Sequence, residues 1–235
     1  MWQKLKKNMR QLAIGDIHGC LKLFEGLLEQ MQFSKNDELF LLGDYVDRGM
    51  NSKGVIDKII ELRHNGFKVN CLMGNHEQLL LHNYYNYDPD AYYPDSACLN
   101  SFKARSVRNI PEKYIAFFKS LPLYMTTEKY ILVHAGLNFK AQDPFSDAES
   151  LTWIRYWYMD LDKDWLNGRI ILHGHTPQTI QDTEKMFKRL NRMPVLNLDC
   201  CAFYSEREPK NHALCGFDMT HRKLYFQAAP PNFWF

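Results

Sequence analysis

The chain has 235 residues, and its 46% hydrophobic and 24% charged residues are typical of a globular protein that buries a sizeable core. Its 29 lysines and arginines nearly balance its 27 aspartates and glutamates, and the net charge of +2 gives no indication of a nucleic-acid or membrane partner. No stretch of the sequence approaches the ~18 apolar residues of a transmembrane helix, and the N-terminal residues lack the apolar run of a secretory signal, so we expect a cytoplasmic protein.

Residues 1–10 are basic and are predicted to form an arm in front of a single domain at 11–235, because no repeat and no linker rich in Pro or Gly divides the chain. Six cysteines lie at positions 20, 71, 98, 200, 201 and 215. Their spacing matches neither a zinc site nor a dense disulfide framework, so we expect reduced thiols. The sequence gives no indication of the oligomeric state.

Five short apolar runs each end in a polar loop that contains Gly, Asp or His. In chain order they are "QLAIGDIHG" (11–19), "ELFLLGDYVDRG" (38–49), "VNCLMGNHE" (69–77), "YILVHAG" (130–136) and "RIILHGHT" (169–176). Each run is predicted to contain a buried strand. Residues 21–31 and 52–65 carry apolar side chains at three- and four-residue steps, which predicts helices between the first three strands. This alternation indicates an α/β fold with a largely parallel first part.

The remaining segments have weaker patterns. Residues 78–121 are predicted to be mainly helical, with a tyrosine-rich segment at 84–93 that either lines a ligand cleft or caps the helices. After Thr176, "VLNLD" (195–199) and "KLYFQ" (223–227) predict a second sheet. The tail "PPNFWF" (230–235) is predicted to pack its aromatic rings on the domain, and an exposed end that binds other surfaces is the alternative.

The polar residues at the five strand ends share one chemistry. They are Asp16, His18, Asp44, Asn75, His76, His134, His173 and His175. A single histidine at a strand end is more often an ordinary polar residue with satisfied hydrogen bonds. Five strand ends that each present carboxylate, amide or imidazole groups beside a glycine instead indicate a metal site, because these groups suit Mn, Fe or Zn and because ligands bind at the carboxyl ends of parallel strands.

The motifs "GDIHG", "GDYVDRG", "GNHE", "VHAG" and "HGHT" resemble, in this order, those of the PPP-type (calcineurin-like) metallophosphoesterases. Within that family the chain most resembles the small bacterial and phage lambda-type serine/threonine protein phosphatases, over residues 11–200. The resemblance implies an α/β fold of the calcineurin-like type. This is a four-layer αββα sandwich with two mixed sheets flanked by helices and a dinuclear metal site at the strand ends. Residues 11–235 would then form one metallophosphoesterase catalytic domain.

The resemblance also implies roles for individual residues. The first metal would be held by Asp16 and His18, the bridge between the metals would be Asp44, and the second metal would be held by Asn75, His134 and His175. His76 would be the general acid and Asp47 would orient it, while Arg48 and, from the looser match in "LTWIRY" (151–156), Arg155 would bind phosphate. His173 and Glu77 are predicted to have structural roles. Two divalent ions per chain are implied, with manganese expected first and iron or zinc as alternatives.

The charges of this set suit a phosphate substrate. Asp16 and Asp44 neutralise only half of the charge of two divalent ions, and two arginines add to what remains. A metal can lower the pKa of its water from 15.7 to about 7, so a metal-bridging hydroxide is the expected nucleophile, attacking phosphorus in line. The sequence contains neither G-x-S-x-G nor a P-loop, and therefore gives no support to a serine nucleophile or to nucleotide-driven transfer.

Three hypotheses about the substrate follow. The first is removal of phosphate from phosphoserine or phosphothreonine, with a phosphoprotein or phosphopeptide as partner. The second is symmetrical diadenosine tetraphosphate hydrolysis, or broad small-molecule phosphatase activity; the related tetraphosphate hydrolases tend to carry Gln in place of His18 and Ala in place of Asp47. The third is an inactive phospho-binding module, against which the intact set of metal ligands argues. The retained His18 and Asp47 favour the protein phosphatase.

One segment departs from the family pattern. Relatives usually read N-x-D-T-G-A after the last histidine motif, whereas this chain reads "NLDCCA" (197–202), so the following loop is predicted to be remodelled. Cys200 and Cys201 are either a redox-sensitive pair or, more commonly for such residues, small buried side chains.

Overall fold

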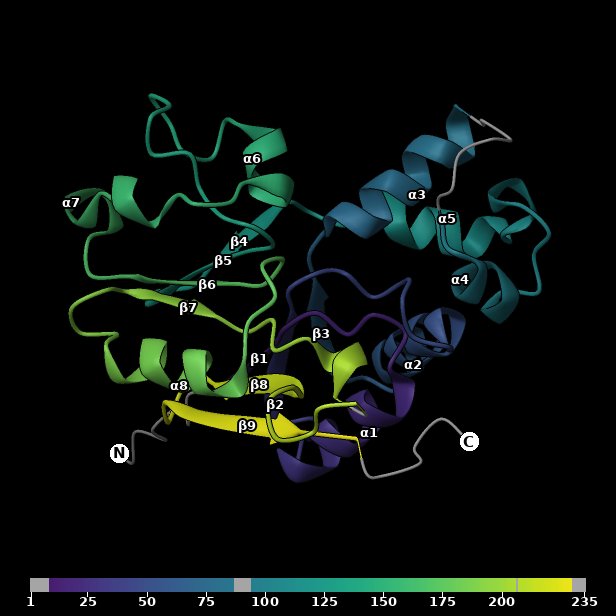
Figure 1. Ribbon diagram of the computed structural model, residues 1–235, viewed down its shortest axis with the longest axis horizontal. Coiled ribbons are helices and arrows are strands. Elements are labelled where there is room, and N and C mark those ends of the chain that lie inside the picture. Colours follow the sequence, from purple (N-terminus) through teal and green to yellow (C-terminus); the bar gives the residue numbers. More distant parts are fainter. Residues whose placement is uncertain (1–8, 87–93, 206, 230–235) are drawn as a thin grey trace, which may run out of the picture.

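The computed structural model describes residues 9–86, 94–205 and 207–229, and Figure 1 shows how their helices and strands are arranged around two sheets. The N-terminal arm up to residue 8, the tail and most of the tyrosine-rich segment, residues 87–93, lie outside the described residues. Arg10 already belongs to the first strand, one residue before the predicted start of the domain.

The first sheet has the strand order β3-β2-β1-β8-β9. Its strands are β1 (Arg10–Ile14), β2 (Asp37–Leu41), β3 (Lys68–Cys71), β8 (Leu214–Asp218) and β9 (Lys223–Gln227). The predicted parallel start is confirmed, because β1 and β3 both run parallel to β2. The assignment of "KLYFQ" to a second sheet is wrong: this segment is β9, which pairs with β8, and β8 lies antiparallel beside β1.

The second sheet has the order β4-β5-β6-β7. Its strands are β4 (Tyr124–Thr126), β5 (Tyr130–Val133), β6 (Ile170–His173) and β7 (Val195–Asn197). The last three are parallel and β4 is antiparallel to β5, so both sheets are mixed. "VLNLD" contributes β7 as predicted, but β4, β5 and β6 precede Thr176, so the sheet begins earlier in the chain than the sequence indicated.

The described residues contain the predicted helices, and three further helices that were not predicted. The predicted ones are α1 (Leu21–Gln30), α2 (Ser52–His64), α3 (Asn75–Tyr85), α4 (Ser96–Ser101) and α5 (Glu112–Lys119), and the others are α6 (Ala148–Trp153), α7 (Lys163–Leu166) and α8 (Ile180–Lys188). The first two fall within one residue of the predicted ranges, and α3, α4 and α5 account for the helical stretch at 78–121. None of the helices in the described residues is long and apolar enough to span a bilayer.

Three clusters of buried apolar side chains separate the molecule into four layers. Alternate residues of β1 face opposite ways: Leu12 and Ile14 pack against the first helices, whereas Ala13 packs against the second sheet. On the far side of the second sheet, Ile131 packs with Leu151 of α6. Figure 1 accordingly shows α1 and α2 beside the first sheet and α6 and α7 over the second. The predicted αββα sandwich is confirmed.

A partly buried ion pair joins the beginnings of the first two strands. Arg10 Nε and Nη2 donate to the two carboxylate oxygens of Asp37 over 2.9 and 2.8 Å, and the Ser34 backbone N–H donates to the same carboxylate over 2.8 Å. Burial alone would raise the pKa of Asp37, but the hydrogen bonds from Arg10 and Ser34 outweigh it and lower the pKa below its ordinary value. The charged carboxylate is therefore stabilised by folding.

Asp37→Asn should lower the free energy of unfolding by about 1 to 3 kcal/mol at pH 7, because the variant loses charge-assisted hydrogen bonds. A lowered folded-state pKa stabilises the fold above the ordinary pKa near ~3.9, and this contribution disappears as the pH falls through the folded-state pKa. The difference between variant and wild type should therefore shrink below about pH 4. Urea unfolding over this pH range measures it, and a difference that stays constant would show that the carboxylate charge is not the cause.

Candidate metal centre

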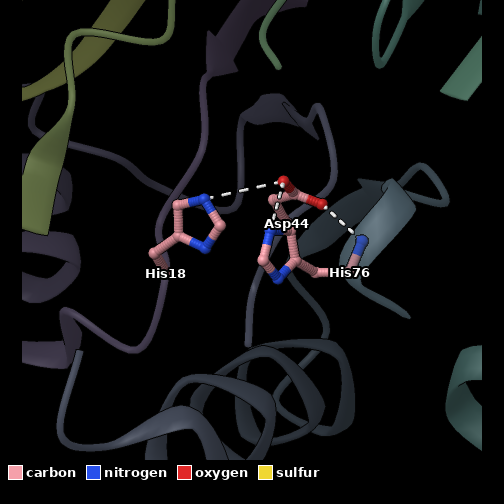
Figure 2. A group of neighbouring side chains, drawn as sticks. All are labelled: His18, Asp44 and His76. Carbon is pink, nitrogen blue, oxygen red and sulfur yellow. Dashed lines mark hydrogen bonds and ion pairs between the residues drawn. The ribbon is translucent and has the colours of Figure 1, made fainter. Parts of the chain in front are cut away.

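The loops after β1, β2, β3, β5 and β6 bring the predicted strand-end residues together. His18 Nε2 and His76 Nε2 lie 3.6 and 3.9 Å from Asp44 Oδ2, and His134 Nε2 lies 3.4 Å from Asp44 Oδ1. Figure 2 shows the His18 and His76 rings next to each other, each with a nitrogen directed at the Asp44 carboxylate. Because residues far apart in sequence meet around one carboxylate, Asp44 is the centre of the site.

Two groups of side chains in the described residues could each hold an ion. One comprises His18, Asp44 and His76, the other comprises Asp44, His134 and His175, and the ligand atoms of each group lie within 4.8 Å of one another. Asp44 belongs to both, as a bridging residue must. The first group contains His76 where the sequence analysis placed Asp16, which lies beside the site and accepts a hydrogen bond from the His175 backbone N–H over 3.0 Å.

The histidine rings are oriented by backbone carbonyls. His18 and His134 donate through Nδ1 to the carbonyls of Val46 and Leu42 over 2.8 and 2.9 Å, and His175 donates through Nε2 to the Trp153 carbonyl over 3.2 Å. Each ring therefore turns its other nitrogen toward the candidate metal site. Metal-binding histidines are commonly held in this way, because the outer hydrogen bond fixes the tautomer and the ring orientation.

Two observations show that these residues fit bound cations. Asp16 Oδ1 is buried and has no hydrogen-bond partner among the described residues. Asn75 Oδ1 lies 3.0 Å from His134 Nε2 and 2.8 Å from His175 Nδ1, so an amide oxygen and two ring nitrogens converge on one point. A positive ion would give the Asp16 oxygen the partner it lacks, since an unpaired acceptor in a buried site is costly.

The pKa values of Asp44 and its neighbours are set by burial and by the charges that face one another in the site. Burial alone would lower the pKa of His134, but the nearby Asp44 carboxylate outweighs it and raises the pKa to about 10. Burial lowers the pKa of His18 to about 3, with smaller contributions from His76 and Arg48. Asp44 stays charged despite its burial, because the surrounding histidines hold its pKa well below the ordinary value. Bound divalent ions would take over the role of the histidine charges that balance Asp44 here, and a buried carboxylate among imidazoles is a donor set that suits such ions.

His76 and Asp47 form a close pair beside this centre. His76 Nδ1 lies 2.7 Å from Asp47 Oδ2, and Ser52 Oγ accepts a hydrogen bond from the Asp47 backbone N–H over 3.0 Å. Burial alone would lower the pKa of His76, but Asp44 and Asp47 raise it above the ordinary value. His76 is held at one nitrogen by a carboxylate and turns the other toward Asp44 at the centre of the site, which is an arrangement that a general acid needs.

The two candidate phosphate-binding arginines are both exposed at the rim. Arg48 lies near His18 and Arg155 lies near His175, since the charge of each contributes to lowering the pKa of that histidine. Arg155, which came from the looser sequence match, follows two residues after Trp153, whose carbonyl accepts the hydrogen bond from His175 Nε2.

Several site residues have positive φ, which is unusual for residues other than glycine. His18, Asp44, Asp47, Arg48 and His175 have φ between 46° and 67°. Such conformations cost about 1 to 3 kcal/mol each and cluster at functional sites, where the surrounding structure enforces them.

Glu77 holds the loop after β2 in its conformation. Its buried carboxylate accepts hydrogen bonds from the backbone N–H groups of Asp44 and Gly74 at one oxygen, over 2.9 and 3.1 Å. The other oxygen accepts from Tyr45 and Val46 over 2.8 and 3.2 Å. This agrees with the structural role predicted for Glu77.

Glu77→Ala should lower the free energy of unfolding by about 3 kcal/mol or more, because several buried backbone donors lose their acceptor at once. Denaturant unfolding measures the loss. Glu149→Ala, at an exposed position of the first turn of α6, is the control and should cost far less. Near-equal stability of the two variants would mean that water replaces the lost carboxylate.

His173 lies inside the fold with both ring nitrogens engaged. Nδ1 donates to the Gly174 carbonyl over 2.8 Å, and Nε2 accepts from the Tyr158 hydroxyl over 2.6 Å. This agrees with the predicted structural role. Asp199 was missed in the sequence: it is buried near Asp16, and burial raises its pKa to about 6. Phe203, whose ring centre lies 4.8 Å from the Arg48 guanidinium carbon, was also missed, because this contact depends on the path of a loop.

A four-layer αββα sandwich with a two-metal donor set at its strand ends defines a metallophosphoesterase. Residues 9–202 match the family described as calcineurin-like phosphoesterase, and the chain belongs to this family. Members of this family are hydrolases with a dinuclear site for divalent metals, and the two donor groups around Asp44 agree with such a site.

Curated relatives differ in their named substrates. The chain is 33% identical over 135 residues to a symmetrical bis(5'-nucleosyl)-tetraphosphatase of Wigglesworthia glossinidia brevipalpis, covering 55% of this chain and 45% of the relative. It is 28% identical over 221 residues to the enzyme of the same name from Psychromonas ingrahamii, covering 86% and 73%. It is 28% identical over 153 residues to Shewanella-like protein phosphatase 1 of Plasmodium berghei, covering 58% and 41%. The matched part thus spans less than half of the first relative.

Solved structures share the fold. A putative diadenosine tetraphosphatase covers 94% of this chain and 93% of its own, with 21% identity and a TM-score of 0.63. A protein serine/threonine phosphatase of Saccharomyces cerevisiae covers 97% and 83%, with 16% identity and a TM-score of 0.67. The names of these relatives and structures divide between tetraphosphatases and protein phosphatases, and what the comparisons share is the metallophosphoesterase family.

Proposed function

We propose that the chain is a metal-dependent hydrolase of dinucleoside polyphosphates such as diadenosine tetraphosphate. The observation that carries this proposal is the match to a symmetrical tetraphosphatase over 86% of the chain. The retained His18 and Asp47, which favoured a protein phosphatase at the level of sequence, are compatible with both substrates, since both reactions need a metal-bound phosphate and a departing oxygen.

In this proposal the ligand set predicted from the sequence holds two divalent ions, with manganese expected first. Bound ions would neutralise phosphate charge and lower the pKa of a water molecule enough to supply hydroxide near neutral pH. Arg48 and Arg155 bind the phosphate oxygens from the two sides of the site. His76 donates a proton to the leaving oxygen, and Asp47 holds the ring in place for this transfer.

Dephosphorylation of phosphoserine or phosphothreonine is the second candidate, and the His76–Asp47 pair favours it. Serine leaves as a strongly basic alkoxide, so a proton donor held 2.7 Å from its orienting carboxylate helps that reaction most. When a nucleotide is the leaving group, the departing atom is a weakly basic phosphate oxygen, so a proton donor accelerates that reaction less. The pair is therefore the feature of the site that best fits a phosphoprotein.

The experiment compares diadenosine tetraphosphate with a phosphoserine peptide, using one manganese-loaded preparation and a chelator-treated control. We expect kcat/KM for the tetraphosphate to be higher by about tenfold or more, which corresponds to about 1.4 kcal/mol of transition-state stabilisation. Chromatography of the nucleotide products distinguishes symmetrical from asymmetrical cleavage. A tenfold preference for the peptide would establish the second candidate, and no turnover of either substrate by the metal-loaded chain would indicate a phospho-binding module.

A further inference from the structure

We infer that Phe203 is a positioning residue that holds the Arg48 guanidinium in place to bind phosphate. The inference rests on the proposed function, in which Arg48 contacts the phosphate group. Phe203 lies in the 3₁₀ turn Ala202–Tyr204, directly after the "NLDCCA" segment in which this chain departs from its relatives.

The contact brings an aromatic ring, the arginine and a proposed metal ligand together. The Arg48 guanidinium carbon lies 4.8 Å from the centre of the Phe203 ring. The same ring packs edge-on against the His18 ring, with the centroids 5.7 Å apart. An arginine that lies over an aromatic face is held by cation–π attraction and keeps its N–H groups available at its edge. Those groups would therefore be held beside the metal ligand His18.

No other side chain in the described residues holds this guanidinium by a hydrogen bond or ion pair. The Arg48 backbone is fixed, since its N–H donates to Asp95 Oδ2 over 2.6 Å, but its side chain is exposed and has several rotatable bonds. Without the ring, these bonds would become ordered only when phosphate binds, and the lost conformational entropy would weaken phosphate binding. Phe203 reduces this loss because it restricts the side chain before the substrate arrives.

The turn that carries Phe203 is itself well anchored. Cys201 begins it with φ of 58°, at the position where the family pattern has glycine, and its N–H donates to Asp199 Oδ1 over 3.0 Å. Tyr204 N–H donates to the Cys201 carbonyl over 2.9 Å. Phe203 also packs on the apolar cluster beneath the first sheet. The ring therefore provides a fixed surface on which the Arg48 guanidinium packs.

The test uses p-nitrophenyl phosphate and inorganic phosphate, which contain no nucleoside or peptide. We expect Phe203→Leu to raise KM and the inhibition constant of inorganic phosphate together by about 3- to 30-fold, the factor that corresponds to a cation–π contact, while kcat changes less. Phe203→Tyr keeps the aromatic face and should behave as the wild type. Phe67→Leu is the matched control, because Phe67 is also partly buried under a cation, Lys35, at 5.6 Å.

The double variant tests whether Phe203 acts through Arg48. In the Arg48→Ala background, Phe203→Leu should cause no further loss, because the group that it positions is gone. An equal loss in both backgrounds, or unchanged phosphate binding in Phe203→Leu, would overturn the inference. Phe203→Met provides a second variant without an aromatic ring, and loss of metal or of folding in both the Leu and Met variants would make the role structural.

The same experiment separates this inference from the proposed function. If the wild type hydrolyses phosphate esters and Arg48→Ala weakens phosphate binding while Phe203→Leu does not, only the inference fails. If the metal-loaded wild type hydrolyses no phosphate ester, the proposed function fails. Calorimetric titration with inorganic phosphate then still measures whether Phe203 and Arg48 act together.

Discussion

Asp44→Asn should lose bound metal and activity together, with turnover falling by roughly 10³-fold or more. Asp44 is the one carboxylate that belongs to both groups of candidate ligands. It is fully buried among His18, His76 and His134, and their proximity holds its pKa well below the ordinary value. Removing this charge leaves the imidazoles without their shared counter-charge, so both metal positions should weaken at once.

The substitution is suited to separating chemistry from folding. Asp44 Oδ1 accepts a hydrogen bond from the His76 backbone N–H over 3.0 Å, and an asparagine oxygen can accept the same bond. The metal-free variant should therefore keep its fold, but it should unfold at a lower temperature than the metal-free wild type, because His134 loses the carboxylate that raises its pKa. Elemental analysis of the metal content, beside turnover of p-nitrophenyl phosphate, measures the effect.

Asp182→Asn is the matched control, because Asp182 is about half exposed on α8 and its side-chain partners within the described part of the chain belong to the same helix and its cap. It should keep both metal and turnover. Retention of the wild-type metal content with normal turnover in Asp44→Asn would show that Asp44 does not bridge the metals.

The sequence predicted which of the site residues would lie close together because each of the motifs is local. A buried strand followed within a few residues by glycine and a polar group, as in "GDIHG" and "GNHE", carries both the strand and the ligand. Parallel strands then place these ligands at one edge without further information. Asp44, His134 and His175 meet for this reason, although they come from loops of two different sheets.

The parts that the sequence missed depend on contacts between distant segments. "KLYFQ" has the pattern of any short strand, and its place in the first sheet is decided by β8, whose Gly216 pairs with Ile14 of β1. Phe203 reaches Arg48 only because Cys201 adopts a positive φ and turns the chain there. Neither local periodicity nor composition contains that information.

His76→Asn should slow hydrolysis of a phosphoserine peptide by about 10² to 10⁴-fold while p-nitrophenyl phosphate hydrolysis falls much less. The reason is the basicity of the departing oxygen: serine alkoxide needs a proton as it leaves, whereas nitrophenolate hardly does. His76 is placed for this donation, since Asp47 holds Nδ1 over 2.7 Å and Nε2 lies on the side of Asp44. Asp47→Asn should produce a milder form of the same difference.

The metal content of His76→Asn decides between two roles for this residue. His76 Nε2 lies among the atoms that could hold the first ion, so a ligand role predicts that metal is lost and that all substrates slow equally. A proton-donor role predicts unchanged metal content and a loss that grows with the basicity of the leaving group. Diadenosine tetraphosphate, with its weakly basic leaving oxygen, should then behave like p-nitrophenyl phosphate. An equal loss on all three substrates, with metal retained and chemistry rate-limiting, would assign His76 to phosphate binding instead.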